Sequence, residues 1–144
     1  RVQTTLRASQ SAKEIARGID TLTIGRTGMG TTAIPFDEVY NRLWNARGLR
    51  CALVLTDGAW ANQKLAVERA RRCHKAEIDV IAVGFGRADE KFLREISSSD
   101  QYSFFTNLER LGDVFSAIAQ ELTEGGGQLD PERMKARRQG LALR

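Results

Sequence analysis

Apolar residues in this chain occur in two patterns, short unbroken runs and longer segments with a spacing of three or four residues. The run over residues 51–55 ends abruptly at Thr56, Asp57 and Gly58. A short apolar run between polar residues is typical of a parallel strand that is buried on both faces. Similar runs predict a second strand over residues 78–85 and a third, shorter one over residues 102–106.

Segments with apolar residues three and four positions apart predict helices. The clearest stripe consists of Leu108, Leu111, Phe115, Ile118 and Leu122. Further helices are expected over residues 8–22, 36–46, 61–76, 90–96 and 131–143. Strands that alternate with helices imply right-handed crossovers. The predicted fold class is therefore α/β, with a parallel sheet flanked by helices.

Three residues are expected to mark helix ends. Pro35 stands where a helix can begin, and Gly48 is expected to cap the C-terminus of that helix. Asp89 is expected to cap the N-terminus of a short helix whose inward face consists of Phe92, Leu93 and Ile96.

Composition and charge divide the chain into two parts. It has 144 residues, 42% of them hydrophobic, which is enough for one domain with a core. Of the net charge of +4, the segment 125–144 contributes +3. We therefore expect an α/β domain over residues 1–124, followed by a Gly-rich joint and a basic tail over residues 125–144. We expect this tail to be solvated and partly helical rather than a nucleic-acid ligand. The alternative is that its helix docks on the body or on a partner.

The cellular location is predicted from the two cysteines and from the lack of membrane-spanning and signal-peptide patterns. No apolar run approaches the ~20 residues that span a membrane, and no signal-peptide pattern occurs. Cys51 and Cys73 are expected to be small buried hydrophobes in a reducing compartment, so we predict a cytoplasmic protein. The chain begins with Arg1, so we expect a piece of a longer polypeptide.

Asp57 is the first candidate for chemistry. In an open α/β sheet the ligand crevice lies beyond the carboxyl ends of the strands, where Asp57 is predicted to stand. The alternative is that Asp57 only caps the next helix. The charged cluster over residues 69–75 is expected to be the solvent face of its helix. No other potential metal ligand stands at a suitable spacing from His74, and no Gly-x-Ser-x-Gly elbow occurs. We therefore expect that the protein is not an enzyme.

The glycine-rich loop over residues 25–32 allows a second interpretation. Its spacing is that of a phosphate loop, G-x-x-x-x-G-[K]-[ST], except that Thr31 replaces the lysine. A degenerate nucleotide-binding protein is therefore one alternative, although the lysine supplies the charge that such a site needs.

Three segments in order resemble the second half of a von Willebrand factor type A (VWA) domain. They are Gly30-Thr31 ahead of Pro35 and a helix, then residues 55–58 (Leu-Thr-Asp-Gly), then residues 80–86 with the helix after Asp89. The resemblance covers about residues 8–123 and implies a Rossmann-like fold.

The resemblance implies a metal-ion-dependent adhesion site (MIDAS), at which a VWA domain holds a divalent cation, usually Mg²⁺. Carried over to this chain, Thr31 and Asp57 are the metal ligands, with Thr32 as a competing choice for the loop ligand. An open coordination position then accepts a carboxylate from a protein partner. The alternative role for Thr31 is that its hydroxyl satisfies backbone donors where the helix begins.

The chain departs from the family pattern in one respect. The first strand of the family ends in Asp-x-Ser-x-Ser, which supplies most of the ligands, and no such motif occurs; residues 20–23 and 97–100 are the nearest approaches. The missing strand would lie beside residues 51–55, so we expect a bare, aggregation-prone edge there. We expect the missing half in cis or in another chain, and poor behaviour of this piece alone.

The functional prediction is a protein-binding adaptor or scaffold without catalysis, acting through Mg²⁺ at Thr31 and Asp57. The alternatives are a metal-free structural half that assembles with another chain or segment, and the degenerate phosphate-loop protein.

Overall fold

The computed structural model describes residues 10–21 and 34–142, and the structure reported below is that of these residues. Three strands, β1 (Cys51–Thr56), β2 (Asp79–Gly84) and β3 (Ser103–Phe105), form a parallel sheet in the order β1-β2-β3. The three predicted strands are confirmed, with ends that differ by one or two residues.

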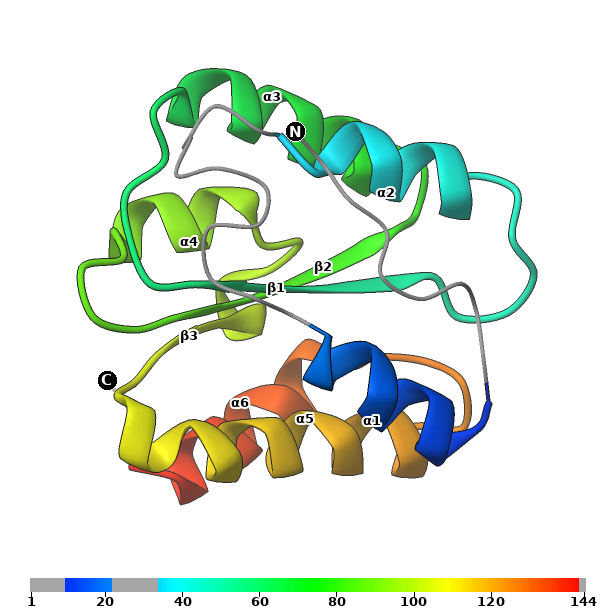
Figure 1. Ribbon diagram of the computed structural model, residues 1–144, viewed down its shortest axis with the longest axis vertical. Coiled ribbons are helices and arrows are strands. Elements are labelled where there is room, and N and C mark those ends of the chain that lie inside the picture. The colour runs from blue at the N-terminus through cyan, green and yellow to red at the C-terminus, as the bar shows by residue number, and fades with distance from the viewer. Residues whose placement is uncertain (1–9, 22–33, 143–144) are drawn as a thin grey trace.

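Helices cover both faces of this sheet (Figure 1). One layer, called the upper layer from its place in Figure 1, contains α2 (Phe36–Leu43), α3 (Gln63–Lys75) and α4 (Glu90–Ile96). The lower layer contains α1 (Ala12–Asp20), α5 (Leu111–Glu124) and α6 (Pro131–Gly140). Two short 3₁₀ turns, η1 (Asp100–Tyr102) and η2 (Leu108–Arg110), flank β3. The predicted α/β class is confirmed.

The upper layer has an apolar core in which Phe36, Phe92 and Leu93 are almost completely buried. Asp89 caps α4 as predicted, because its carboxylate accepts hydrogen bonds from the amides of Lys91 and Phe92. A Cβ at position 84 would lie 2.3 Å from Leu93 Cδ1, so the glycine there lets α4 approach β2 closely.

The buried face of α5 differs from the predicted stripe. Ile118 is buried, but Leu108 and Leu122 are 68% and 38% exposed. The residues of α5 that are buried are Val114, Ala117, Ile118 and Glu121. The helix presents this face because α6 packs beside it and contributes Met134, which is completely buried, to the lower core.

The predicted last helix is observed as α6, and it docks on the domain rather than standing free in solvent. Asp130 caps this helix, and Pro131 occupies its first turn. Met134 is buried among Ile81, Tyr102 and Phe104. The helix is basic, yet its arginines bind the domain rather than project into solvent, as the close view below shows.

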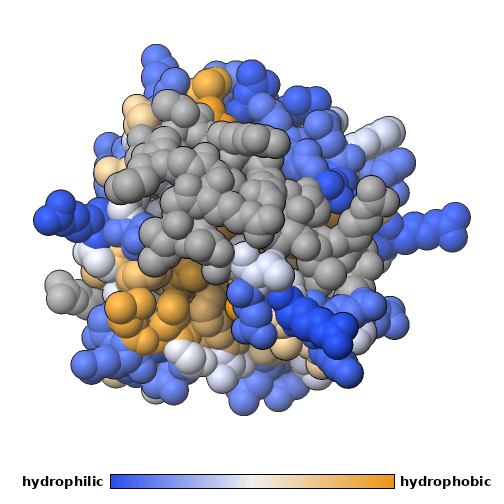
Figure 2. All heavy atoms as spheres, viewed as in Figure 1, coloured by the Kyte–Doolittle hydropathy of each residue, from blue (hydrophilic) through white to orange (hydrophobic). Residues whose placement is uncertain are grey.

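Strand β1 is the edge of the sheet among the described strands. Burial of β1 on both faces was expected and is wrong, because Leu53 and Leu55 are 45% and 47% exposed. Their register partners on β2, Ile81 and Val83, lie in the lower core, so the two leucines face the lower side. Figure 2 shows hydrophobic atoms gathered at the lower left of the face in view. The expected exposure of an apolar side at β1 is thus confirmed for the described residues, whereas the unpaired backbone of this edge stays a prediction.

The end of α2 corrects a second expectation. The helix ends at Leu43 with Trp44 as its C-cap, four residues before Gly48. Gly48 has a φ of +78° in the loop that follows, so it shapes the connection to β1 instead of capping α2.

Candidate functional site

The carboxyl end of β1 is fixed by the side chain of Thr56. Its hydroxyl accepts a hydrogen bond from Trp60 Nε1 at 3.0 Å and donates one to the carbonyl of Gly58 at 3.2 Å. The Trp60 ring packs against Phe36 and Phe92, with centroid distances of 6.0 and 5.3 Å. The turn that carries Asp57 is therefore anchored in the upper core, and Thr56 serves this turn.

The main chain of Asp57 joins the turns that follow β1 and β2. Its carbonyl accepts a hydrogen bond from the amide of Arg87 at 3.0 Å. A Cβ at Gly86, where φ is +64°, would lie 3.2 Å from the same carbonyl. Glycine therefore permits this close approach, and the two turns lie side by side at the carboxyl edge of the sheet.

The side chain of Asp57 is exposed at this edge. Within residues 10–21 and 34–142, its carboxylate has no hydrogen-bond or ion-pair partner. It also does not cap α3, because Asn62 takes that role by accepting the amide of Leu65. The alternative of a helix-capping Asp57 is therefore wrong. An exposed carboxylate is a hard oxygen donor of the kind that Mg²⁺ prefers.

The second predicted ligand, Thr31, lies outside the described residues, as do its competitor Thr32 and the phosphate-loop segment 25–32. In the part of the chain that the structure describes, no three His, Cys, Asp or Glu side chains gather as a metal cluster. The described residues thus contribute one candidate ligand, Asp57, to a site that needs others.

The nearest described approach to the missing Asp-x-Ser-x-Ser motif has structural roles. Ser97 is buried and donates its hydroxyl to the carbonyl of Leu93. Ser98 Oγ accepts the amide of Val80 at 2.7 Å, and Ser99 caps η1. These serines join α4 to β2 and start η1, so they are not available as metal ligands at the carboxyl edge.

The other side chains with possible reactivity are those of the cysteines and the histidine, and they lie toward the end of the sheet at which the strands begin. Burial, with a contribution from the charge of Asp79, raises the pKa of Cys51 to about 12. His74 Nε2 donates to the carbonyl of Ile96 at 3.0 Å, and burial lowers the pKa of this imidazole. Both cysteines are free thiols, and Cys73 donates to the carbonyl of Phe36. Cys73 is buried as expected, whereas Cys51 is only half-buried, so that part of the expectation is wrong. Burial raises the pKa of both thiols, which makes them poor nucleophiles.

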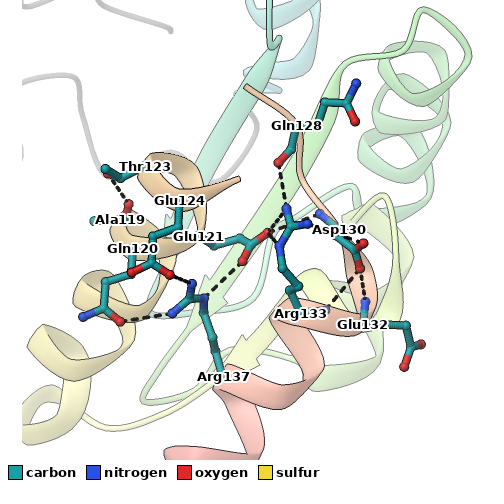
Figure 3. A network of polar contacts seen from close by, with 10 residues as sticks. All are labelled: Ala119, Gln120, Glu121, Thr123, Glu124, Gln128, Asp130, Glu132, Arg133 and Arg137. Atoms are coloured by element: carbon teal, nitrogen blue, oxygen red, sulfur yellow. Dashed lines mark hydrogen bonds and ion pairs between the residues drawn. The ribbon is translucent and has the colours of Figure 1, made fainter. Parts of the chain in front are cut away.

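A buried carboxylate that sequence reasoning missed joins α5 to α6 (Figure 3). Glu121 is completely buried, and its oxygens accept hydrogen bonds from Arg133 Nε at 2.9 Å and Arg137 Nε at 3.1 Å. The amide of Asp130 donates to it at 3.3 Å. Burial alone would raise the pKa of Glu121, but the two arginines outweigh it and hold this pKa below its ordinary value. Glu121 follows Ile118 by three residues, and this helical spacing was the one sequence signal that could have placed Glu121 on the buried face.

The helices of the described residues include none that is long and apolar enough to cross a bilayer.

Comparisons with known proteins return one result. The family model of the von Willebrand factor type A domain matches residues 1–120. Neither the curated proteins nor the solved structures contain a match. The family model spans most of the chain, and the parallel sheet with helices on both faces has the architecture that the resemblance implied. The chain belongs to the von Willebrand factor type A domain family.

Proposed function

We propose that this chain is a protein-binding module that recognises its partner at the carboxyl edge of the sheet, through Mg²⁺ held by Thr31 and Asp57. The observation that carries the proposal is the Asp57 carboxylate. It is exposed, has no partner among the described residues, and stands on a turn that Trp60 and Arg87 fix. A ligand held on a rigid turn loses little freedom when it binds.

The chemistry suits a shared metal. Mg²⁺ is held by one or two carboxylates, hydroxyl and carbonyl oxygens, and several waters. Asp57 fits the role of one such ligand, and Thr31 would add a hydroxyl. The remaining protein ligands would come from an Asp-x-Ser-x-Ser segment, in cis or in another chain. An open position could then accept a carboxylate of the partner.

The proposed role is that of a cytoplasmic adaptor or scaffold without catalytic activity. Two features support it. Cys51 and Cys73 are free thiols, as is usual in a reducing compartment. The one histidine, His74, is bound to a backbone carbonyl at the edge opposite to Asp57.

The test is calorimetric titration of Mg²⁺ into the full-length protein and into its Asp57→Ala variant. Asp113→Ala is the matched control, because Asp113 is an exposed carboxylate on α5, paired only loosely with Arg110 at 3.9 Å. We expect saturable binding that weakens tenfold or more, about 1.4 kcal/mol, in Asp57→Ala and is unchanged in the control. Equal binding by all three proteins would refute the role of Asp57.

A second candidate, metal-free assembly through the edge of the sheet, is supported by the exposed Leu53 and Leu55. An edge strand with unpaired backbone groups and an apolar side can add a strand from another chain or segment. Sedimentation velocity should then show association of the full-length protein, which Leu53→Lys with Leu55→Lys abolishes without any effect of chelation. A monomer at all concentrations would exclude association with a second copy.

A further inference from the structure

We propose that the groove along α3 is a docking site for an acidic segment of a partner protein. The groove has a volume of about 780 Å³ and is lined by residues of α3 together with Glu95 of α4. Both helices belong to the upper layer (Figure 1). Its charged lining consists of Lys64, Arg71, Arg72, Lys75, Glu68 and Glu95. It is separate from the carboxyl edge, so this proposal does not rest on the metal site.

The cations of the groove differ in their pairing from three other arginines of the described chain. Arg69 pairs with Asp37 at 3.7 Å, Arg94 with Glu90 at 3.9 Å, and Arg50 with Glu77 at 3.2 Å. By contrast, the four basic side chains of the groove make no ion pair with any residue that the structure describes. Four cations against two carboxylates leave the lining with a net charge of +2, a positive potential that attracts an anionic ligand.

The basic side chains of the groove extend along α3, an arrangement that suits an elongated ligand. Lys64 and Lys75 are eleven residues apart on one helix, a distance of about 16 Å or three helical turns. Val67, which is 7% exposed, provides an apolar floor. The guanidinium of Arg72 stacks on the Tyr40 ring at 3.7 Å, which restrains the arginine in an extended position.

The acidic residues of the groove favour a peptide over a nucleic acid. Glu68 and Glu95 lie among the cations and would repel the continuous phosphates of a nucleic-acid backbone. A peptide carries its carboxylates at intervals and can place basic or neutral side chains opposite these two residues. Among the residues that the structure describes, the lining contains no aromatic side chain on which a base could stack.

The test measures fluorescence anisotropy of a labelled peptide with the full-length protein, in a chelating buffer that removes the metal site from the experiment. The peptide has about twelve residues, long enough for three helical turns, with glutamates on one face. A peptide with lysines in place of the glutamates and a single-stranded DNA oligomer are the other two probes. The groove variant is Arg71→Glu with Lys75→Glu. The control variant, Lys13→Glu with Arg47→Glu, changes the net charge equally at two exposed residues outside the groove.

We expect the acidic peptide to bind with a salt-sensitive affinity that falls about tenfold or more in the groove variant and not in the control. The lysine peptide should not bind. Failure of the acidic peptide to bind, or equal binding by both variants, would overturn the proposal. Binding of the DNA oligomer alone, lost in the groove variant, would also overturn it and assign the groove to nucleic acid.

Discussion

The two helical layers of this domain are attached to one sheet in different ways. In the upper layer, α2, α3 and α4 pack through a nearly uniform apolar core that includes the Trp60 ring between Phe36 and Phe92. In the lower layer, the attachment of α6 depends on Met134 and on the buried charge of Glu121. The lower layer also leaves Leu53 and Leu55 exposed beneath β1.

The difference separates a layer that is closed by apolar packing from a layer that leaves apolar side chains of β1 exposed. An apolar core is formed by burial alone, and it supports the turns that carry Asp57. A buried ion pair contributes less to stability than to the choice of one arrangement, because desolvation offsets most of its attraction. The upper layer therefore positions the candidate site, whereas the lower layer fixes the orientation of α6.

The largest expected effect comes from Phe92→Ala. Phe92 is 2% exposed and contacts Trp60, so its loss leaves a cavity and should lower the free energy of unfolding by about 3–5 kcal/mol. Denaturant titration measures this change. Leu108→Ala, at a residue that is 68% exposed, is the control and should stay within about 0.5 kcal/mol. A loss below about 1 kcal/mol for Phe92→Ala would contradict the role given to the upper core.

Glu121→Gln should have the next largest effect. The amide keeps the shape of the side chain but cannot accept from both arginines, so we expect a loss of about 1–3 kcal/mol in the free energy of unfolding. Glu124→Gln is the matched control, because Glu124 is 63% exposed and its one ion pair among the described residues is with Arg137. Its effect should be about 0.5 kcal/mol or less. Equal effects of the two variants would show that burial of Glu121 is unimportant.

The smallest expected effect is a pH dependence of the free energy of unfolding that arises in the lower layer alone. Because the pKa of Glu121 lies below its ordinary value of 4.5 in the folded state, its contribution is present above that value. The contribution is lost as the pH falls through the lowered pKa, where the folded carboxylate also becomes protonated. The stability difference between the native protein and Glu121→Gln should therefore shrink in acid. The loss of stability in Phe92→Ala should not shrink in acid. Equal changes with pH in both variants would contradict the difference drawn between the two layers.

Local sequence signals predicted most of the upper layer. The polar stop at Thr56, the cap at Asp89 and the inward face of α4 depend on neighbouring residues, and the structure confirms all three. The position of Asp57 at the end of β1 follows from the same local pattern. The second predicted metal ligand, Thr31, falls outside the described residues, so its role stays a prediction.

The lower layer could not be predicted in the same way, because its packing depends on contacts between distant residues. A glutamate is normally placed in solvent, and Glu121 is buried only because Arg133 and Arg137 approach it from α6. The exposure of Ile15 and Ile19 on α1, at 41% and 61%, also contradicts the simple assignment of an apolar stripe to the core. Charge pairing across two helices leaves no periodic pattern in a single segment.

The most direct test of the account is a Mn²⁺ titration of the full-length protein, followed by NMR line broadening of its backbone amides. Mn²⁺ replaces Mg²⁺ at sites built from carboxylate and hydroxyl oxygens. We predict selective broadening of Gly58, Gly86 and Arg87, whose backbones surround Asp57, and its loss in Asp57→Ala. Broadening centred instead on Glu77 and Asp79, at the opposite edge of the sheet, would contradict a metal-binding role for Asp57.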